Sequence, residues 1–279
     1  MTDLIFPGQQ VGEFSVTAIS DGYLSASLEL LSNIDPADAC RRQKAAGQRD
    51  PTAIHINCYL VRGRGRTILI DAGAGGYKQW GGDLRTNLAL AGVHPVEIDT
   101  ILLTHAHPDH AGGLMDEHGA AVFPNAELVV HRREIGFWED EDNLCRASER
   151  ARGNFQIARQ AFDTYRARLR SFDSGEVIPG IHAVPLPGHT AGHSGFRLDS
   201  GKHGLLVWGD IVHFPRIQIA RPDVSIAFDQ DMLLSATTRS RLLDIVSAEQ
   251  LIIAGMHLGK AGFARIGRTA ESYEIFDEP

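Results

Sequence analysis

The feature that most restricts the fold of this chain is a group of four possible metal ligands packed into one turn. Residues 98–104 are apolar and β-like, and the six positions that follow contain His105, His107, Asp109 and His110. Imidazole nitrogens and carboxylate oxygens suit Zn²⁺ and its first-row neighbours. In a sharply turning loop, residues two apart can reach one ion while their neighbours reach a second. The segment therefore predicts a metal site at the end of a strand.

Three later apolar runs also end on a possible ligand. The ligands are His189 after residues 181–186, Asp210 after residues 205–209 and His257 after residues 251–256. A single histidine after a strand is more often a hydrogen-bonded structural residue. The repeated pattern instead indicates that these residues and the first group form one metal-binding set.

The turn after residue 104 resembles the His-x-His-x-Asp-His signature of the metallo-β-lactamase superfamily, a large and chemically diverse set of hydrolases. The resemblance implies two ligand sets joined by a bridging carboxylate. The sets are His105, His107 and His189 for one ion, and Asp109, His110 and His257 for the other, with Asp210 as the bridge. It also implies two divalent transition-metal ions per chain, zinc first, with Mn, Fe or Co as alternatives.

Two further polar residues are candidates for supporting the ligands. Asp71 follows the β-rich residues 66–70 and matches an earlier strand-end aspartate of the superfamily. We expect it to accept a hydrogen bond from a ligand histidine, the alternative being a turn residue before Gly73. His193 is either an acid or transition-state donor, or a histidine bonded to nearby backbone.

The length and composition allow one large core. The chain has 279 residues, of which 43% are hydrophobic, and no linker-like tract interrupts it. Because the candidate ligands extend from residue 105 to residue 257, we expect a single domain over residues 1–279. The resemblance implies an α+β fold, the αβ/βα four-layer sandwich, with two central mixed sheets flanked by helices and the ligands at one edge.

Sequence patterns place most of the elements of this fold. Strands are expected at residues 13–20, 55–61, 66–70, 98–104, 126–131, 180–186, 194–198, 204–209 and 250–254, and helices at residues 84–91, after Pro108 and at residues 232–246.

Residues 132–172 combine many charges with apolar residues at near-helical spacing, and predict helices. These helices are either an ordinary amphipathic layer or a cap-like segment beside the metal site. The candidate aromatic residues of a substrate pocket are Phe137, Trp138, Phe196 and Phe214.

The formal charge of −8 disfavours binding to a phosphate backbone, and the arginines of residues 146–170 are interleaved with acids. No positive leader or membrane-length apolar run is present, so we expect a cytoplasmic protein without a membrane partner. Three widely spaced cysteines, Cys40, Cys58 and Cys145, fit reduced thiols. The expected partner is a small-molecule substrate rather than nucleic acid, and a homodimer is left open.

The resemblance implies hydrolysis by a metal-bridging hydroxide, with Asp109 and Asp210 accepting its hydrogen bond or passing its proton to the leaving group. A narrower similarity, to the methyl parathion hydrolase and lactonase branch, is carried by residues 14–22, 122–127, 208–213 and 221–231. We therefore expect the enzyme to open a lactone or cleave a carboxylic ester.

The alternatives are a phosphotriester or phosphodiester hydrolase, a β-lactamase, a mononuclear iron dioxygenase acting on a persulfide, and a non-catalytic metal-binding module. Because no clustered phosphate-binding arginines are evident in the sequence, a neutral, fairly apolar lactone or ester is the expected substrate.

Overall fold

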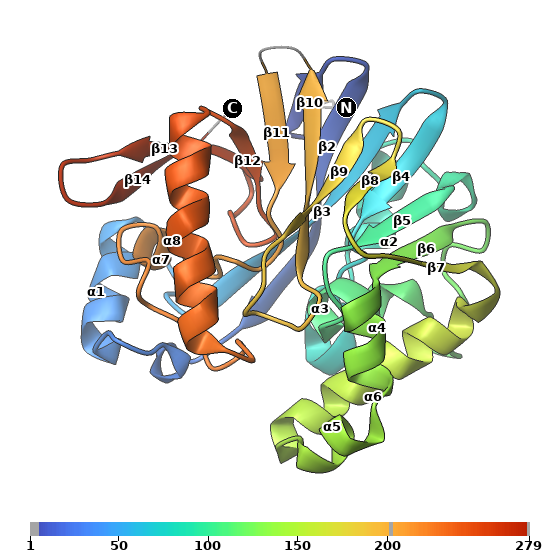
Figure 1. The fold of residues 1–279 in the computed structure, drawn as a ribbon, viewed down its shortest axis with the longest axis horizontal. Coiled ribbons are helices and arrows are strands. Elements are labelled where there is room, and N and C mark those ends of the chain that lie inside the picture. The colour runs from blue at the N-terminus through green and yellow to red at the C-terminus, as the bar shows by residue number, and fades with distance from the viewer. Residues whose placement is uncertain (1–5, 201–202, 278–279) are drawn as a thin grey trace.

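The computed structural model describes residues 6–200 and 203–277. In these residues two mixed seven-stranded sheets lie face to face between layers of helices (Figure 1). The first sheet runs in the order β1 (Gly8–Val11), β2 (Phe14–Ser25), β3 (Ala53–Gly63), β4 (Arg66–Ile70), β5 (Thr100–Leu103), β6 (Glu127–His131) and β7 (Leu169–Phe172). The second runs in the order β14 (Tyr273–Asp277), β13 (Phe263–Arg268), β12 (Ile252–Ala254), β11 (His203–Val207), β10 (Ser194–Ser200), β9 (Ile181–Pro185) and β8 (Gly175–Ile178).

The helices form the two outer layers. They are α1 (Pro36–Ala45), α2 (Leu84–Leu90), α3 (Pro108–Ala111), α4 (Arg132–Glu139), α5 (Glu141–Arg146), α6 (Glu149–Thr164), α7 (Pro215–Gln218) and α8 (Met232–Ala248), with short 3₁₀ turns η1 (Leu28–Leu30), η2 (Tyr77–Gln79), η3 (Pro95–Glu97), η4 (Gly112–Leu114) and η5 (Arg166–Arg168). In Figure 1, α8 covers the second sheet with α1 and α7 beside it, and α4 and α6 lie on the side of the first sheet. This arrangement confirms the expected four-layer sandwich.

Four apolar cores hold the layers together, the fourth of them beside α1 and α7. Val16, Tyr59 and Phe263 belong to the core between the sheets, and Leu243 of α8 packs on the outer face of the second sheet. The third core joins α2, α4 and α6 to the first sheet. Strand β5 is buried at every residue, as expected for a parallel strand covered on both faces.

Parallel pairing places the strand ends that carry the candidate site. Strands β4, β5 and β6 are parallel neighbours in the first sheet, and β11 and β12 are parallel in the second. Since parallel strands end at the same edge, the residues just beyond them lie close together. Asp71 follows β4, His105 follows β5 by two residues, and Asp210 and His257 follow β11 and β12 by three residues each.

The expected elements are present, and the differences are local. The sequence patterns did not predict β1, β8, β13, β14, α1 or α7, and residues 169–172 form β7 rather than a helix. Helix α1 nevertheless has an ordinary start signal, because the Asp35 carboxylate caps the N–H groups of Ala37 and Asp38 and Pro36 is the first helical residue.

Residues 132–172 are both a packing layer and part of a pocket wall. Trp138 of α4, and Phe155 and Phe162 of α6, belong to the core of the first sheet. The end of α5 and the first turn of α6 face a cavity instead. The segment therefore contributes both to the packing layer and to the pocket lining, and its role as a cap stays a prediction. Among the described residues, no helix combines the length and apolar character that a membrane crossing needs.

The buried carboxylate of Asp21 fixes the loop between β4 and α2. Its Oδ2 accepts the N–H of Ala74 at 2.7 Å, and its Oδ1 accepts those of Gly82 and Leu84, each at 2.9 Å. Burial raises the pKa of Asp21, against the effect of these hydrogen bonds. A side chain at Gly81 would collide with Asp21, since an added Cβ would lie 2.0 Å from Oδ2.

Replacing Asp21 with alanine leaves these three N–H groups without their acceptor, and we expect the free energy of unfolding to fall by roughly 3 kcal/mol or more. Urea denaturation measures this loss. Asp83→Ala is the control, because Asp83 is exposed and makes no capping hydrogen bond to α2. An equal loss in both variants would contradict the role given to Asp21.

Candidate metal centre

Three buried imidazole nitrogens meet in one triangle. His105 Nε2 lies 3.1 Å from His107 Nδ1 and 3.1 Å from His189 Nε2, and the third side, from His107 Nδ1 to His189 Nε2, is 3.0 Å. His105 and His107 come from the turn between β5 and α3, and His189 from the loop between β9 and β10. The triangle is therefore formed by loops of both sheets.

The outer nitrogens of this triangle show which ring atoms carry protons. His189 Nδ1 donates to the Asp229 carboxylate at 2.9 Å. His105 Nδ1 lies 3.0 Å from the Thr104 hydroxyl, which itself donates to Asp71 at 2.7 Å and so accepts from the ring. When both rings are neutral, both Nε2 atoms therefore carry lone pairs. Two lone pairs 3.1 Å apart make no hydrogen bond, whereas a shared cation would bind both.

A second group contains Asp109, His110, Asp210 and His257, all buried. Asp210 Oδ2 lies 3.1 Å from His110 Nε2 and 3.2 Å from His257 Nε2, while Asp109 Oδ2 lies 3.6 Å from His257 Nε2. Among the described residues, His110 Nε2 and Asp210 Oδ1 are buried without a hydrogen-bond partner.

The outer nitrogens of the second group are also fixed. His110 Nδ1 donates to Asp71 Oδ2 at 2.6 Å, and His257 Nδ1 donates to the carbonyl oxygen of His55 at 2.7 Å. Asp71 therefore makes the contact that the sequence predicts for it. It does so from a left-handed backbone conformation with a φ of 59°, a strained geometry for a residue other than glycine.

The electrostatics of both groups favour a bound cation. Burial holds the pKa values of His105 and His107 well below the ordinary value, so both rings are neutral, the form that binds metal. Burial alone would lower the pKa of His110, but nearby carboxylates, Asp210 first, raise it well above its ordinary value. Burial alone would raise the pKa of Asp109, but the neighbouring His110 lowers it to about 2. The second group is therefore a place of negative potential.

The residues present thus fit metal ions. The nitrogen and oxygen donors suit zinc and its first-row neighbours, and each fixed ring leaves its free nitrogen directed into the cluster. Asp210 Oδ2 also lies 3.5 Å from His189 and 3.8 Å from His105, so Asp210 stands between the two groups. The structure brings together all seven residues named from the sequence, and their action as ligands stays a prediction.

His193 supports Asp210 through the backbone. Its Nδ1 donates to the Leu186 carbonyl at 2.8 Å, and its Nε2 accepts the N–H of Asp210 at 2.9 Å. Burial lowers the pKa of this ring to about 3. Because both nitrogens are engaged within the protein, the geometry favours the backbone-bonded alternative over an acid that reaches the substrate.

Glu134 of α4 is a supporting residue that the sequence did not reveal. Its buried Oε1 accepts the N–H of Ala106 at 3.1 Å and Nε1 of Trp138 at 2.7 Å, and its Oε2 accepts the Thr190 hydroxyl and the Gly192 N–H, both at 2.8 Å. One carboxylate therefore ties the turn of His105 and His107 to the loop of His189 and to the pocket wall. It is one of many acids in residues 132–172, so no local signal distinguishes it.

Asp229 and His213 were also missed. Asp229 accepts from His189, which holds its pKa below the usual value against the effect of burial. His213 Nε2 lies 3.2 Å from Asp210 Oδ2, and His189, Asp210 and His213 form a third possible ligand group. For His213 the sequence held a usable signal, since it follows the predicted ligand Asp210 by three positions.

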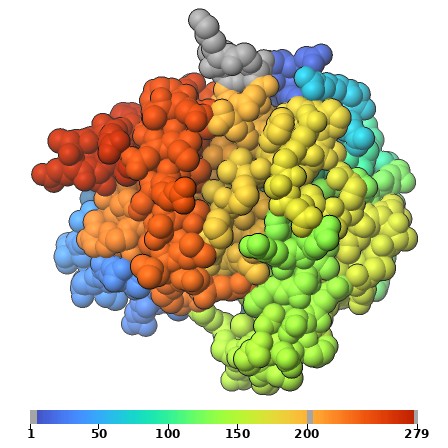
Figure 2. Space-filling model, viewed as in Figure 1, coloured from blue at the N-terminus to red at the C-terminus, as the bar shows by residue number. Residues whose placement is uncertain are grey.

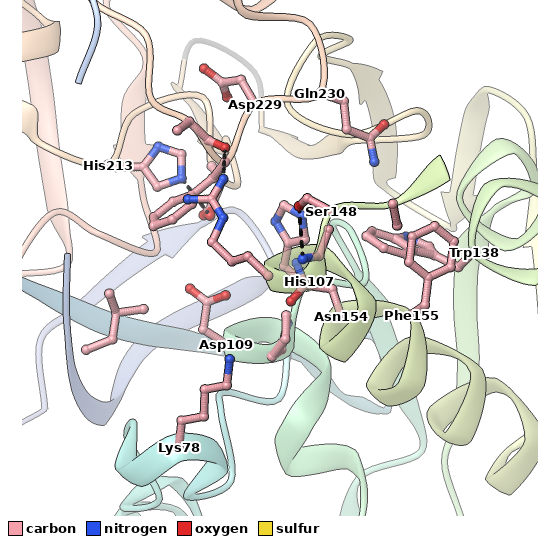
Figure 3. Close-up of a pocket in the computed structure, with 18 of the residues that line it drawn as sticks. Lys78, His107, Asp109, Trp138, Ser148, Asn154, Phe155, His213, Asp229 and Gln230 are labelled. Carbon is pink, nitrogen blue, oxygen red and sulfur yellow. Dashed lines mark hydrogen bonds and ion pairs between the residues drawn. The ribbon is translucent and has the colours of Figure 1, made fainter. Parts of the chain in front are cut away.

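A cavity of about 510 Å³ opens onto the metal-binding groups. Figure 2 shows the surface hollowed between the green segment that carries α5 and the orange part of the chain. Figure 3 shows His107, Asp109 and His213 of the pocket lining together with Ser148, the N-cap of α6, and Asn154 and Phe155 of that helix. Its apolar lining consists chiefly of Leu24, Ile54, Trp80, Phe137, Trp138, Phe155 and Phe228.

Two of the four predicted pocket aromatics lie elsewhere. Phe137 and Trp138 line the cavity, and the Trp138 ring meets that of His107 edge-on at 5.6 Å between centroids. Phe196 is wrong, because its position in β10 directs it into the core between the sheets. Phe214 is also wrong, since it is buried in the core beside α1 and α7.

Residues 51–257 match the family model described as the metallo-beta-lactamase superfamily. Among solved structures, the hydrolase AbOPH of the beta lactamase superfamily is 30% identical, with a TM-score of 0.92 over 98% of this chain and 97% of that chain. AidC, a dizinc quorum-quenching lactonase in complex with the product N-hexanoyl-L-homoserine, is 25% identical, with a TM-score of 0.90 over the same shares.

Curated relatives match over a shorter region. The uncharacterized protein YobT of Bacillus subtilis (strain 168) is 32% identical over 161 residues, 57% of this chain and 63% of YobT. The N-acyl homoserine lactonase of Bacillus cereus is 24% identical over 168 residues, 60% of this chain and 59% of the lactonase. The match thus spans about three fifths of either relative's length.

Zinc-loaded protein is expected to hold two ions per chain, because two converging groups share one carboxylate. Asp210→Ala should lose more metal and more activity than His193→Ala, since His193 acts on Asp210 only through its backbone N–H. Elemental analysis and hydrolytic rates measure both. A ceiling of one ion, or equal losses in the two variants, would contradict this assignment.

Glu134→Gln should weaken metal retention by about 10- to 100-fold and lower the free energy of unfolding by about 2 kcal/mol, because an amide turns an N–H₂ group towards two hydrogen-bond donors. Competition with a chelator and urea denaturation measure the two effects. Glu127→Gln is the matched control, because Glu127 pairs with Arg170 at the surface of the first sheet. Unchanged metal affinity in Glu134→Gln would refute its positioning role.

Proposed function

The chain belongs to the metallo-β-lactamase superfamily. From this premise we propose that it is a metallo-hydrolase that opens lactones or cleaves carboxylic esters at a dinuclear, zinc-loaded centre. The observation that carries the proposal is that metal-binding residues form the floor of the cavity. Asp109, Asp210 and His257 belong to the metal-binding groups and also line the pocket, so a bound small molecule reaches them directly.

The donor sets support a proposed assignment of the ligands. His105, His107 and His189 would hold one ion, and Asp109, His110 and His257 the other, with Asp210 between them. When bound, two such ions supply an activated water and polarise the oxygen of the bond to be cleaved. Zinc is proposed because the donors suit it and because AidC is a dizinc lactonase.

The carboxylates of the pocket floor can direct the proton of the attacking water. Asp210 Oδ1 makes no hydrogen bond in the described structure, although it lies 3.2 Å from His257 Nε2, and Asp109 faces the cavity. Either oxygen can accept a hydrogen bond from the water, which orients its lone pair towards the substrate carbonyl. The same carboxylate can then pass the proton to the departing alkoxide, and the reaction needs no serine or cysteine nucleophile.

The cavity walls support an acyl or aryl group on the substrate. Phe137, Trp138 and Phe155 form one apolar wall, and Phe228 lies on another part of the lining. A cavity of about 510 Å³ is in the range that holds drug-sized molecules, and burying apolar surface there favours binding. The similarity to AidC, which holds an acyl homoserine product, supports the same class of substrate for this chain.

The test is a side-by-side assay of zinc-loaded protein on acyl homoserine lactones, simple γ- and δ-lactones, aryl esters and a phosphotriester. We expect lactones or esters to turn over fastest, with the activity lost in Asp210→Ala. Turnover of the phosphotriester alone, with kcat/KM of about 10⁴ M⁻¹s⁻¹ or more, would replace this proposal with an organophosphate hydrolase. Inactivity of the fully loaded protein towards the whole panel would refute it.

A further inference from the structure

Three cationic side chains line the same cavity. Lys78 comes from η2, Arg146 from the end of α5 and Arg150 from the first turn of α6. Lys78 extends from its turn into the pocket on the side of Asp109 (Figure 3). This group could not be predicted from the sequence, because Lys78 is far from the two arginines along the chain and the arginines are interleaved with acids.

No carboxylate of the described residues lies within ion-pair distance of any of the three. Other arginines of the same helical segment are paired: Arg159 lies 2.6 Å from Glu141, and Arg166 lies 2.8 Å from Asp163. Arg152, outside the cavity lining, has no ion pair with a described residue either, so what distinguishes Lys78, Arg146 and Arg150 is that they meet at one pocket, an arrangement that suits an anionic ligand.

Neutral groups hold these cations in place. The Arg150 guanidinium lies over the Phe228 ring at 5.4 Å and donates to the carbonyl oxygen of Ala227 across the cavity. Arg146 donates to Asn143 Oδ1 at 2.9 Å, and Lys78 Nζ lies 5.7 Å from the centre of the Trp80 ring. Such contacts restrict the side chains without cancelling their charge.

The carboxylates of the cavity lining are bound to the histidines of its floor rather than to the cations. The carboxylates of its lining are Asp109, Asp210 and Asp229, and each is engaged by a histidine of the metal-binding groups. The amino end of α6, a helix of 16 residues, also faces the cavity at Ser148 and adds positive potential there. The pocket thus combines a metal-binding floor, an apolar wall and three free cations.

We infer that Lys78, Arg146 and Arg150 form a subsite for an anionic group of the substrate, and that the substrate is an ester or lactone whose apolar part carries a carboxylate, sulfate or phosphate besides the bond that is cleaved. The sequence analysis predicted a neutral substrate because no clustered cations were evident. The three cations at the pocket replace that expectation with an anionic substrate. The hydrolytic part of this inference rests on the proposed function, whereas anion binding does not.

The kinetic test compares matched 4-nitrophenyl esters with zinc-loaded protein. The anionic series is the monoesters of adipate, suberate and sebacate, and the neutral series is hexanoate, octanoate and decanoate. At the best chain length we expect the anionic ester to have a kcat/KM about tenfold higher, with the advantage reduced at 0.5 M salt by charge screening. In the triple variant Lys78→Gln/Arg146→Gln/Arg150→Gln the anionic-to-neutral ratio should fall at least about fivefold.

Arg152→Gln is the matched control, since Arg152 is an exposed arginine of the same helix outside the cavity lining, and its ratio should stay that of the parent protein. Binding is measured separately by titrating the zinc-loaded protein with hexyl sulfate and following tryptophan fluorescence, because Trp80 and Trp138 line the cavity. The triple variant should bind hexyl sulfate about tenfold more weakly, and hexan-1-ol should not distinguish the two proteins.

The outcomes separate the two proposals. Preference for the neutral ester at every chain length, with hexyl sulfate bound equally by parent and triple variant, would overturn the anion subsite and leave the hydrolase proposal standing. Absence of turnover with every ester and with the lactones of the panel above, together with hexyl sulfate binding that depends on the three cations, would overturn the hydrolase proposal and support the subsite.

Discussion

The imidazole rings of His105 and His189 face each other through unprotonated nitrogens 3.1 Å apart, an arrangement that is repulsive without a cation between them. The fold enforces it from outside. Thr104 and Asp229 hold the opposite nitrogens of these two rings, and Asp71 and the backbone of His55 do the same for the second group. Because each of these four rings is fixed by a partner outside the cluster, its other nitrogen cannot turn away, and this part of the site is preorganised for metal.

The arrangement of the two sheets places these residues at one edge of the sandwich. Parallel pairing of β4 with β5 and of β11 with β12 brings the loops after four strands together, two from each sheet. Glu134 then joins loops of both sheets and the pocket wall through four hydrogen bonds. Any shift of α4 is therefore transmitted to the imidazole triangle, which links the helical segment to the metal centre as well as to the cavity.

The sequence predicts the ligands and the layers because both follow local rules. A ligand just beyond an apolar strand is visible in the order of residues, and so is the hydrogen-bonding role of Asp71. Glu134 and the cation cluster were missed because each depends on how separate segments pack. The prediction that Phe196 lines the pocket was also wrong. The pleat of β10, and not the position of Phe196 near His193 in the sequence, decides which face of the sheet its side chain occupies. Local sequence patterns therefore predict the metal-binding residues at the floor of the cavity, whereas the residues of its walls depend on tertiary packing.

Anomalous scattering at the zinc edge, from crystals of zinc-loaded protein, tests the central claim most directly. Fixed lone pairs and a shared carboxylate predict two peaks about 3.5–4 Å apart, one at the triangle of His105, His107 and His189 and the other among Asp109, His110 and His257, with Asp210 touching both. The outer hydrogen bonds of the rings should stay in place. A single peak, or rings that have turned away from the cluster with their outer hydrogen bonds broken, would contradict the account.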